Sequence, residues 1–197
     1  MKGDSEIWEN FKNGDKSALS YIYFQNFHSM FHYGIKFKND SEFIKDCIQE
    51  VFFKLIKAGK RLGNTDNIRF YLFRALKNSI LRELENSRKV DIVDESRLKF
   101  ESHFSLEEEI LQKEKLSLQE KALANALNSL SNRQREIIYL KYECGMEYSQ
   151  ICELMLINAD SARKLVFRAI KSLKEIINKQ INSSVLFLIH LRKKHVL

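Results

Sequence analysis

The chain has 197 residues, of which 44% are hydrophobic and 30% charged, and its formal net charge is +7. This composition supplies enough apolar side chains for one domain or two small ones, and it excludes an intrinsically disordered chain. The sequence contains no proline and only six glycines, which favours long helices joined by short polar turns over a sheet protein. We therefore expect an all-α fold.

The charge is distributed in blocks along the chain. Residues 1–90 carry 16 Lys/Arg against 11 Asp/Glu (net +5), whereas residues 91–120 carry 4 against 9 (net −5). Residues 159–180 are again basic, with 6 Lys/Arg against 2 Asp/Glu (net +4), and residues 181–197 add three cations and no acid. Two basic blocks separated by an acidic one predict two polyanion-binding surfaces joined by a segment that repels or imitates nucleic acid.

Targeting signals and cysteine usage favour the cytoplasm. Acidic and polar residues interrupt each apolar run near Met1, and the late apolar run Val185–Leu191 is too short to span a bilayer. The three cysteines, Cys47, Cys144 and Cys152, form no CxxC pair, which is typical of a reducing compartment.

The first predicted domain covers residues 1–89. Its aromatic-rich segment 17–38 is expected to form one packed helix, and Asp40 or Ser41 can cap a second. In this second helix apolar residues recur every four positions from Phe43 to Ile56 and predict a wide buried stripe. A polar turn, residues 60–66, separates it from a third helix with Phe73, Leu76, Ile80 and Leu84 on one face.

The second predicted domain covers residues 109–180 and follows an acidic linker, residues 90–108, in which hydrophobic periodicity is lost. Its helical pattern resumes near Glu109, and Asn132 precedes a helix over residues 133–142. Residues 181–197 form a basic tail, read most simply as a packed final helix, with a contact to a regulatory protein or to a membrane surface as alternatives.

Two short helical patterns meet at a tight connection near the end of this domain. Residues 148–156 present Ile151, Leu154 and Met155, and Asn158 can cap a following helix whose inward stripe includes Ala162 and Ala169. The opposite face displays Arg163, Lys164, Phe167, Arg168 and Lys171. Long cationic side chains on the second helix of such a pair suit insertion into a DNA major groove, although an ordinary solvated basic face has the same pattern.

The residues themselves resemble a known family. Leu127–Leu130, Arg135-Glu136, Tyr142–Gly145, Tyr148–Ile151 and Ser161–Leu173 resemble the promoter-reading C-terminal region of extracytoplasmic-function (ECF) sigma factors. By that resemblance Arg163, Lys164, Phe167 and Arg168 fall where the family contacts the −35 element. Asp46–Leu55 resembles the family's polymerase-binding helix, and Phe70–Asn78 resembles its −10-reading helix. Their order and separation favour a sigma factor over an unrelated helix-turn-helix protein.

This resemblance assigns surfaces in the first domain. Asp46, Gln49, Glu50 and Lys54 share a polar face, which in the family docks on core RNA polymerase. The expected −10 contacts are a basic ridge and the loop beside it, Arg74, Lys77, Asn78 and Arg82 with Lys60, Arg61 and Asn64. Solvated faces are the alternative at both surfaces.

Four positions depart from the family's pattern. Asn132 stands where Pro is common and Cys152 where Ala is common. The other two affect the expected helix boundaries. Glu147 stands where a capping Ser or Thr is usual and is a poor N-cap, so the helix there is expected to start elsewhere or to fray. Leu156 stands where Gly or Asn is usual, and we expect it to need no positive φ.

The implied partners are promoter DNA, core RNA polymerase and, as a candidate, a membrane-bound anti-sigma factor. No catalytic residue, cofactor, small-molecule substrate or metal site is predicted. His28 and His32 are spaced to share a metal but lack a third ligand nearby in the sequence. The rival functions are a helix-turn-helix regulator that does not join the polymerase, a metal-dependent enzyme built on the two histidines, and a membrane-surface adaptor using the tail.

Overall fold

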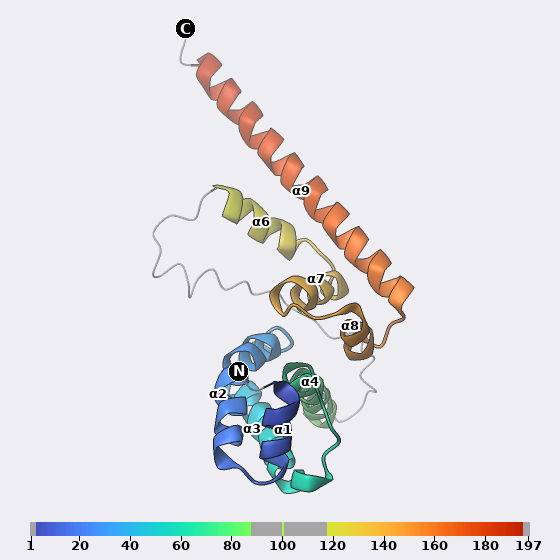
Figure 1. Ribbon diagram of the computed structural model, residues 1–197. Helices are drawn as coiled ribbons and strands as arrows, with labels where there is room; N and C mark the ends of the chain where they lie inside the picture. Colours follow the sequence, from blue (N-terminus) through green and yellow to red (C-terminus); the bar gives the residue numbers. More distant parts are fainter. Residues whose placement is uncertain (1–2, 88–99, 101–117, 195–197) are drawn as a thin grey trace. The chain divides into compact units, whose positions relative to one another are not determined.

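The computed structural model describes residues 3–87, 100 and 118–194, and the chain divides into two compact units, residues 1–101 and 102–197. Each unit is built from helices, labelled in Figure 1. The described residues contain no β-strand, in agreement with the expected all-α fold. None of the helices in these ranges combines the length and apolarity that crossing a membrane requires.

Within the described residues, the first unit is a bundle of four helices: α1 (Asp4–Lys12), α2 (Lys16–Ile35), α3 (Ser41–Ala58) and α4 (Ile68–Ser87). A short 3-10 turn, η1 (Gly59–Arg61), follows α3. The Asp15 carboxylate caps α2 by accepting hydrogen bonds from the Ser17 and Ala18 amides, and Asp40 caps α3 by accepting one from the Phe43 amide at 3.1 Å. Asp40 is therefore the cap of α3, one of the two residues that the sequence allowed.

Helices α2, α3 and α4 enclose the core of this unit. Tyr33 is fully buried and stacks on Phe73 of α4 with ring centroids 4.8 Å apart. Gly34 lies so close to α3 that a Cβ atom would come within 2.6 Å of Ile44 Cγ2, so only glycine fits this crossing. The side chain of Phe100 also belongs to this core, because its ring lies 5.2 Å from Phe37 and is 2% exposed.

Two expectations for the first unit differ in detail from the structure. Ile56 was expected in the buried stripe of α3 but is 56% exposed, since the stripe ends at Leu55 and the next position turns outward. The aromatic segment 17–38 was expected to form one packed helix, and a packed helix forms there, but it ends at Ile35 and Phe24 is 76% exposed. A single helix facing two neighbours buries only part of its circumference, and this segment has aromatic residues all around it.

The second unit contains α6 (Leu118–Asn128), α7 (Asn132–Ile138), a π-helical turn η3 (Tyr139–Glu143), α8 (Tyr148–Met155) and α9 (Ala159–Lys194). Ser131 caps α7 in a reciprocal pair of hydrogen bonds with Gln134 of 3.0 and 3.4 Å, so the helix expected after Asn132 begins at Asn132 itself. Leu127, Leu130 and Ala169 form a buried cluster against which Ile138 and Leu173 pack. The acidic linker 90–108, apart from Phe100, and the predicted helical start at 109–117 lie outside the described residues.

Candidate nucleic-acid and polymerase interfaces

Helices α8 and α9 form a helix-turn-helix whose buried side matches the expectation from the sequence. Ile151, Leu154 and Met155 of α8 are buried, as are Ala162, Val166 and Ala169 of α9. The Asn158 side chain accepts a hydrogen bond from the Ser161 amide at 2.8 Å, so Asn158 caps α9 as predicted. In α7, the Arg133 guanidinium donates to the Met155 carbonyl at 3.2 Å and so satisfies an acceptor at the end of α8.

The turn between the two helices differs from the expectation at Leu156. This residue has φ 50° and ψ 51°, the left-handed conformation, so the expectation that it would need no positive φ is wrong. The geometry is dictated by the tight connection, because the left-handed residue ends α8 and lets the Ile157 amide donate to the Cys152 carbonyl at 3.0 Å. Leu156 is 73% exposed, so no side-chain packing compensates the strain.

The start of helix α8 also differs from the expectation, because Glu147 is its N-cap. Helix α8 begins at Tyr148 with Glu147 in an extended N-cap conformation, and the Glu147 amide donates to Gln150 Oε1 at 3.0 Å. A residue three positions into the helix thus satisfies the backbone of this weak N-cap. The expected shift of the helix start is wrong.

The exposed face of α9 carries five side chains that the sequence singled out. All of them are exposed, and the Phe167 ring is 68% exposed although it is large and apolar. Arg163 lies 3.5 Å from Asp160 and Lys171 lies 3.9 Å from Glu175, both as exposed pairs within one or two turns. Such pairs contribute little to stability, so these cations remain available to a polyanion. The residues of this face are Arg163, Lys164, Phe167, Arg168 and Lys171.

In the first unit, the loop between α3 and α4 is held by α1, a helix that the sequence analysis did not identify. The Trp8 indole donates to the Gly63 carbonyl at 2.8 Å, and Lys12 donates to the Asn64 side chain at 2.6 Å. The Asp4 carboxylate accepts a hydrogen bond from the Ile68 amide at 2.8 Å and so caps the start of α4. These contacts join residues more than 50 positions apart, and the only sequence signal was the lone tryptophan near Met1.

The predicted −10 contacts occupy different environments. Lys60, Arg61 and Asn64 are exposed on the loop, and Arg74 and Asn78 are exposed on α4. Lys77 is instead buried, with 4% of its surface exposed. Arg82 is half-buried and its guanidinium contacts Glu50 of α3 and Glu83 of α4. The ridge is thus less uniform than its i+4 spacing suggested.

On α3 the predicted polymerase-binding residues Asp46, Gln49 and Lys54 are exposed and Glu50 is half-buried. Hydrogen bonds from Lys54, Ser79 and Arg82 lower the pKa of Glu50 to about 2, so this carboxylate is ionised at neutral pH. Apolar residues share the outer surface of α3, because Phe53 is 64% exposed beside the polar positions.

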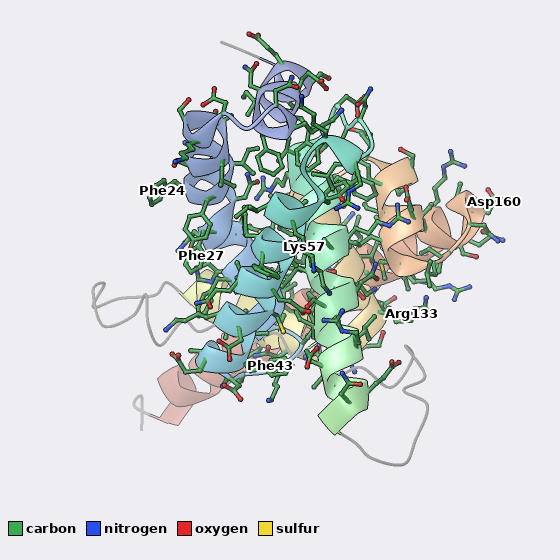
Figure 2. The ribbon with its side chains drawn as sticks, turned by 90° about the horizontal axis from the view of Figure 1, so that it is seen from below. Phe24, Phe27, Phe43, Lys57, Arg133 and Asp160 are labelled. Atoms are coloured by element: carbon green, nitrogen blue, oxygen red, sulfur yellow. The ribbon has the colours of Figure 1, made fainter. Side chains whose placement is uncertain are left out.

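Exposed aromatic residues extend onto the neighbouring helix α2. The Phe24 and Phe27 side chains project outward from α2 (Figure 2), and Tyr23 connects them to Phe52 of α3 through ring contacts of 5.6, 5.3 and 5.0 Å. The hydrophobic character of these aromatic residues predicts a packed helix, so this surface could not be recognised from the sequence.

The two histidines of α2 lie side by side, with 2.9 Å between their Nε2 atoms. Within the described ranges no group of three metal-ligating side chains exists. Cys47 and Cys144 are buried, and burial raises the pKa of the Cys47 thiol to about 11, which makes it a poor nucleophile.

These features define a two-unit helical protein with a helix-turn-helix and a second basic surface. A family model described as Sigma-70 region 2 matches residues 25–90, and one described as Sigma-70, region 4 matches residues 120–173. Together the two matches cover more than half of the chain. The chain belongs to the sigma-70 family and is an ECF-type sigma factor, as the resemblance indicated.

Solved structures agree with this assignment at the level of the fold. The structure of CnrH in complex with the cytosolic domain of CnrY is similar with a TM-score of 0.59 and 15% identity, covering 90% of this chain and 99% of CnrH. The sigma factor RpoE of Bartonella quintana, in complex with the anti-sigma factor NepR, is similar with a TM-score of 0.50 and 20% identity, covering 83% of this chain and 96% of RpoE. A comparison with curated protein sequences gives no significant match.

As an ECF-type sigma factor, the protein binds core RNA polymerase and directs promoter-specific initiation by recognising the −35 and −10 elements. The region 2 match begins at residue 25, so α1 lies outside it. The helix that holds the loop is therefore not part of what the family model recognises.

Proposed function

We propose that the exposed face of α9 reads the −35 element of the promoter. The observation that carries this proposal is the five-residue face of cationic and aromatic side chains on the second helix of a helix-turn-helix, backed by buried Ala162 and Ala169. Small buried residues let α9 pack closely on the unit while its outer face enters the major groove. Arg163 and Arg168 would pair with base edges, and Lys164 and Lys171 would neutralise phosphates.

The −10 strand would bind the loop after α3 and the exposed side of α4. Lys60, Arg61 and Asn64 lie on a loop that α1 holds in place, which supports a preformed site for an extruded base. Arg74 and Asn78 would continue the contact along α4, with Lys77 and Arg82 as the less accessible members of the set.

The outer face of α3 would dock on core RNA polymerase. Asp46, Gln49, Glu50 and Lys54 supply polar contacts, and the exposed Phe53 ring supplies apolar area at the centre of the same surface. An apolar centre with a polar rim is the usual anatomy of a protein interface.

A regulatory partner and a division into domains are also part of the proposed function. We propose an anti-sigma factor as a further partner, because NepR is the anti-sigma factor bound to RpoE in the similar structure. The proposed division assigns residues 1–89 and 109–180 to the two promoter-binding domains, 90–108 to the linker and 181–197 to a tail. The protein would act in the cytoplasm and assist initiation without catalysing a reaction.

Transcription in vitro tests this function. The purified chain is added to core RNA polymerase and a library of promoter fragments, and we expect a stable complex and initiation at a defined subset of promoters. Sequence-specific DNA binding without a polymerase complex would instead establish the rival function, a helix-turn-helix regulator.

One substitution tests the base-reading role. Arg168→Ala is expected to cost about 1–3 kcal/mol of upstream-element binding and to relax the preference at one base pair. Lys174→Ala, which removes one exposed cation from the same side of the helix about one turn beyond the proposed contacts, serves as the control. An equal loss of binding affinity on all DNA sequences would show that Arg168 contacts a phosphate and not a base.

A further inference from the structure

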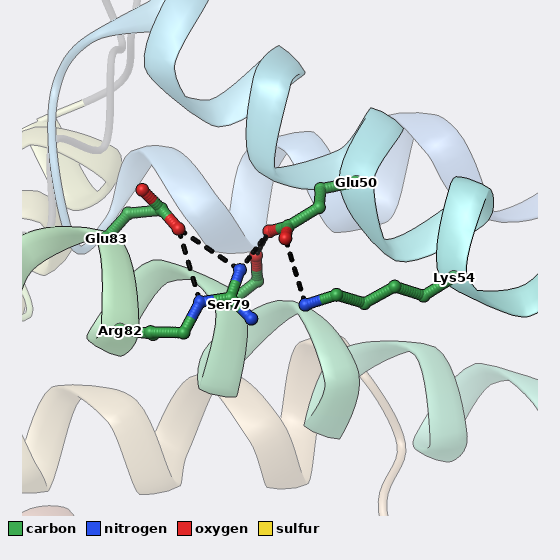
Figure 3. Close-up of polar contacts among 5 residues, drawn as sticks. All are labelled: Glu50, Lys54, Ser79, Arg82 and Glu83. Carbon is green, nitrogen blue, oxygen red and sulfur yellow. Dashed lines mark hydrogen bonds and ion pairs between the residues drawn. The ribbon is translucent and has the colours of Figure 1, made fainter.

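Five side chains between α3 and α4 form one connected polar cluster (Figure 3). The Glu50 carboxylate accepts hydrogen bonds from Lys54 at 2.9 Å and from the Ser79 hydroxyl at 2.7 Å, and its Oε2 atom also contacts the Arg82 guanidinium. Glu83 accepts from Arg82 Nε and Nη2 at 3.2 and 3.1 Å. Arg82 is thus held between two carboxylates, one from each helix.

This cluster joins residues that belong to two different proposed interfaces. Glu50 lies on the face of α3 proposed for polymerase, and Arg82 lies on the ridge of α4 proposed for the −10 strand. Both side chains are partly exposed, 34% for Glu50 and 43% for Arg82, so a partner can reach either of them. In the free protein, however, the Glu50 carboxylate and the Arg82 guanidinium contact each other.

The electrostatics of the cluster oppose binding of DNA at Arg82. A phosphate approaching this guanidinium meets two carboxylates within hydrogen-bond distance of the same group, and Glu50 is fully ionised at neutral pH because its pKa is about 2. Removing Glu50, or engaging it with another cation or donor, leaves Arg82 with one carboxylate partner, Glu83, in place of two, so its positive charge is less fully neutralised. The state of Glu50 therefore sets the affinity of Arg82 for a phosphate.

We propose that Glu50 and Arg82 form a releasable bridge, in which docking of polymerase on Glu50 frees Arg82 to bind the promoter strand. This proposal rests on the proposed function, because it takes its two interfaces from there. By linkage, the factor by which polymerase strengthens the strand contact at Arg82 equals the factor by which the strand strengthens polymerase binding. Arg82 therefore contacts Glu50 in the free protein and the promoter strand in the complex with polymerase.

The free protein provides the first test. Binding of the full chain to a fluorescein-labelled single-stranded oligothymidine is measured by anisotropy over a series of salt concentrations, because a phosphate contact does not depend on sequence. Glu50→Gln is expected to bind several-fold more tightly than the wild type. Its slope of log affinity against log salt is expected to be steeper by about 0.7, the value for one added phosphate contact on a single strand.

Matched variants separate release of Arg82 from a general change of charge. Glu85→Gln removes one exposed carboxylate from α4 three positions from Arg82, and it is expected to leave the slope unchanged. In an Arg82→Gln background, Glu50→Gln is expected to have no larger effect than Glu85→Gln. Equal effects of the two glutamine substitutions in the wild-type background, or an effect that survives the loss of Arg82, would overturn the proposal.

Folding and polymerase binding are measured alongside. If Glu50→Gln loses the circular dichroism spectrum of the folded protein, Glu50→Asp replaces it. The aspartate keeps the negative charge but its shorter side chain withdraws the carboxylate from Arg82. An unchanged salt slope in Glu50→Asp counts against the bridge. With saturating core polymerase, the wild type and Glu50→Gln are expected to have the same slope, and a persisting difference refutes release by polymerase. If the wild type does not bind polymerase, the proposed function is refuted, whereas the single-strand binding measured on the free protein still tests the Glu50–Arg82 bridge.

Discussion

Replacing Trp8 by phenylalanine should loosen α1 from the loop that precedes α4. Trp8 is 1% exposed, donates its indole N–H to the Gly63 carbonyl at 2.8 Å, and contacts Phe11 and Tyr71 with centroid distances of 5.4 and 4.9 Å. Phenylalanine keeps an aromatic ring in this place but has no donor and fills less volume. The substitution therefore removes one hydrogen bond and leaves a small cavity.

The magnitude follows from these two losses. The hydrogen bond contributes about 0.5–1.5 kcal/mol net, and the missing ring atoms cost about 1–2 kcal/mol in burial and cavity terms. Together they lower the free energy of unfolding of the first unit by about 1.5–3.5 kcal/mol, which corresponds to a Tm lower by roughly 6–28 °C for a domain of this size. Phe24→Leu, which shortens an aromatic side chain that is 76% exposed, is the control and should change stability by less than about 0.5 kcal/mol.

Urea unfolding followed by circular dichroism measures the loss, and amide hydrogen exchange locates it. The Ile68 amide donates to Asp4 of α1, whereas the Phe70 amide donates to Asn67 within the start of α4 itself. Release of α1 in Trp8→Phe should accelerate exchange at Ile68 while Phe70 keeps most of its protection. Wild-type stability, or unchanged protection at Ile68, would refute the role given to Trp8.

Three further substitutions address strain, pH and the core. Leu156→Gly should stabilise the second unit by about 0.5–1 kcal/mol in urea unfolding, because glycine adopts the left-handed conformation found there without a Cβ penalty; destabilisation would contradict the strain. Because hydrogen bonds from Lys54, Ser79 and Arg82 lower the pKa of Glu50 from 4.5 to about 2, its contribution is present above about pH 4.5 and is lost as the pH falls toward 2; Glu50→Gln should lack this part of the acid dependence. Phe100→Ala should destabilise the first unit by about 3 kcal/mol, because it empties a site that is 2% exposed, and an unchanged urea midpoint would refute that packing.

The features that could be predicted from the sequence depend on neighbours along the chain. A cap and a hydrophobic period are local, so the Asn158 cap, the choice of Asp40 or Ser41 as the cap of α3, and the buried stripes of α3 (up to Leu55) and α9 followed from spacing alone. The family resemblance worked for a similar reason, since its motifs are short runs within single helices.

The features that could not be predicted are set by distant residues or by the geometry of a connection. Helix α1 has only nine residues, too few to be stable alone, and its fixing contacts reach 55 and 64 positions along the chain to Gly63 and Ile68. The left-handed Leu156 is imposed by the turn that connects α8 and α9, against the preference of its own side chain. The pairing of Arg82 with Glu50 could not be predicted, because the spacing along each helix accounts for each residue separately. It places Glu50 on a polar face and Arg82 on a basic ridge.

The two proposed promoter-binding surfaces differ in how their cations are held before DNA arrives. On α9, Arg163 and Lys171 make exposed ion pairs of 3.5 and 3.9 Å, which a phosphate can displace at little cost, and Arg163 also lies 6.0 Å from the Tyr148 ring centroid. On α4, Arg82 is shared between carboxylates of two helices, one of which, Glu50, belongs to the proposed polymerase surface. If the bridge operates as proposed, the face of α9 is ready to bind duplex DNA in the free protein, whereas full engagement of the −10 strand follows polymerase binding. Contact with the single strand would then be strengthened where the polymerase is present to use it.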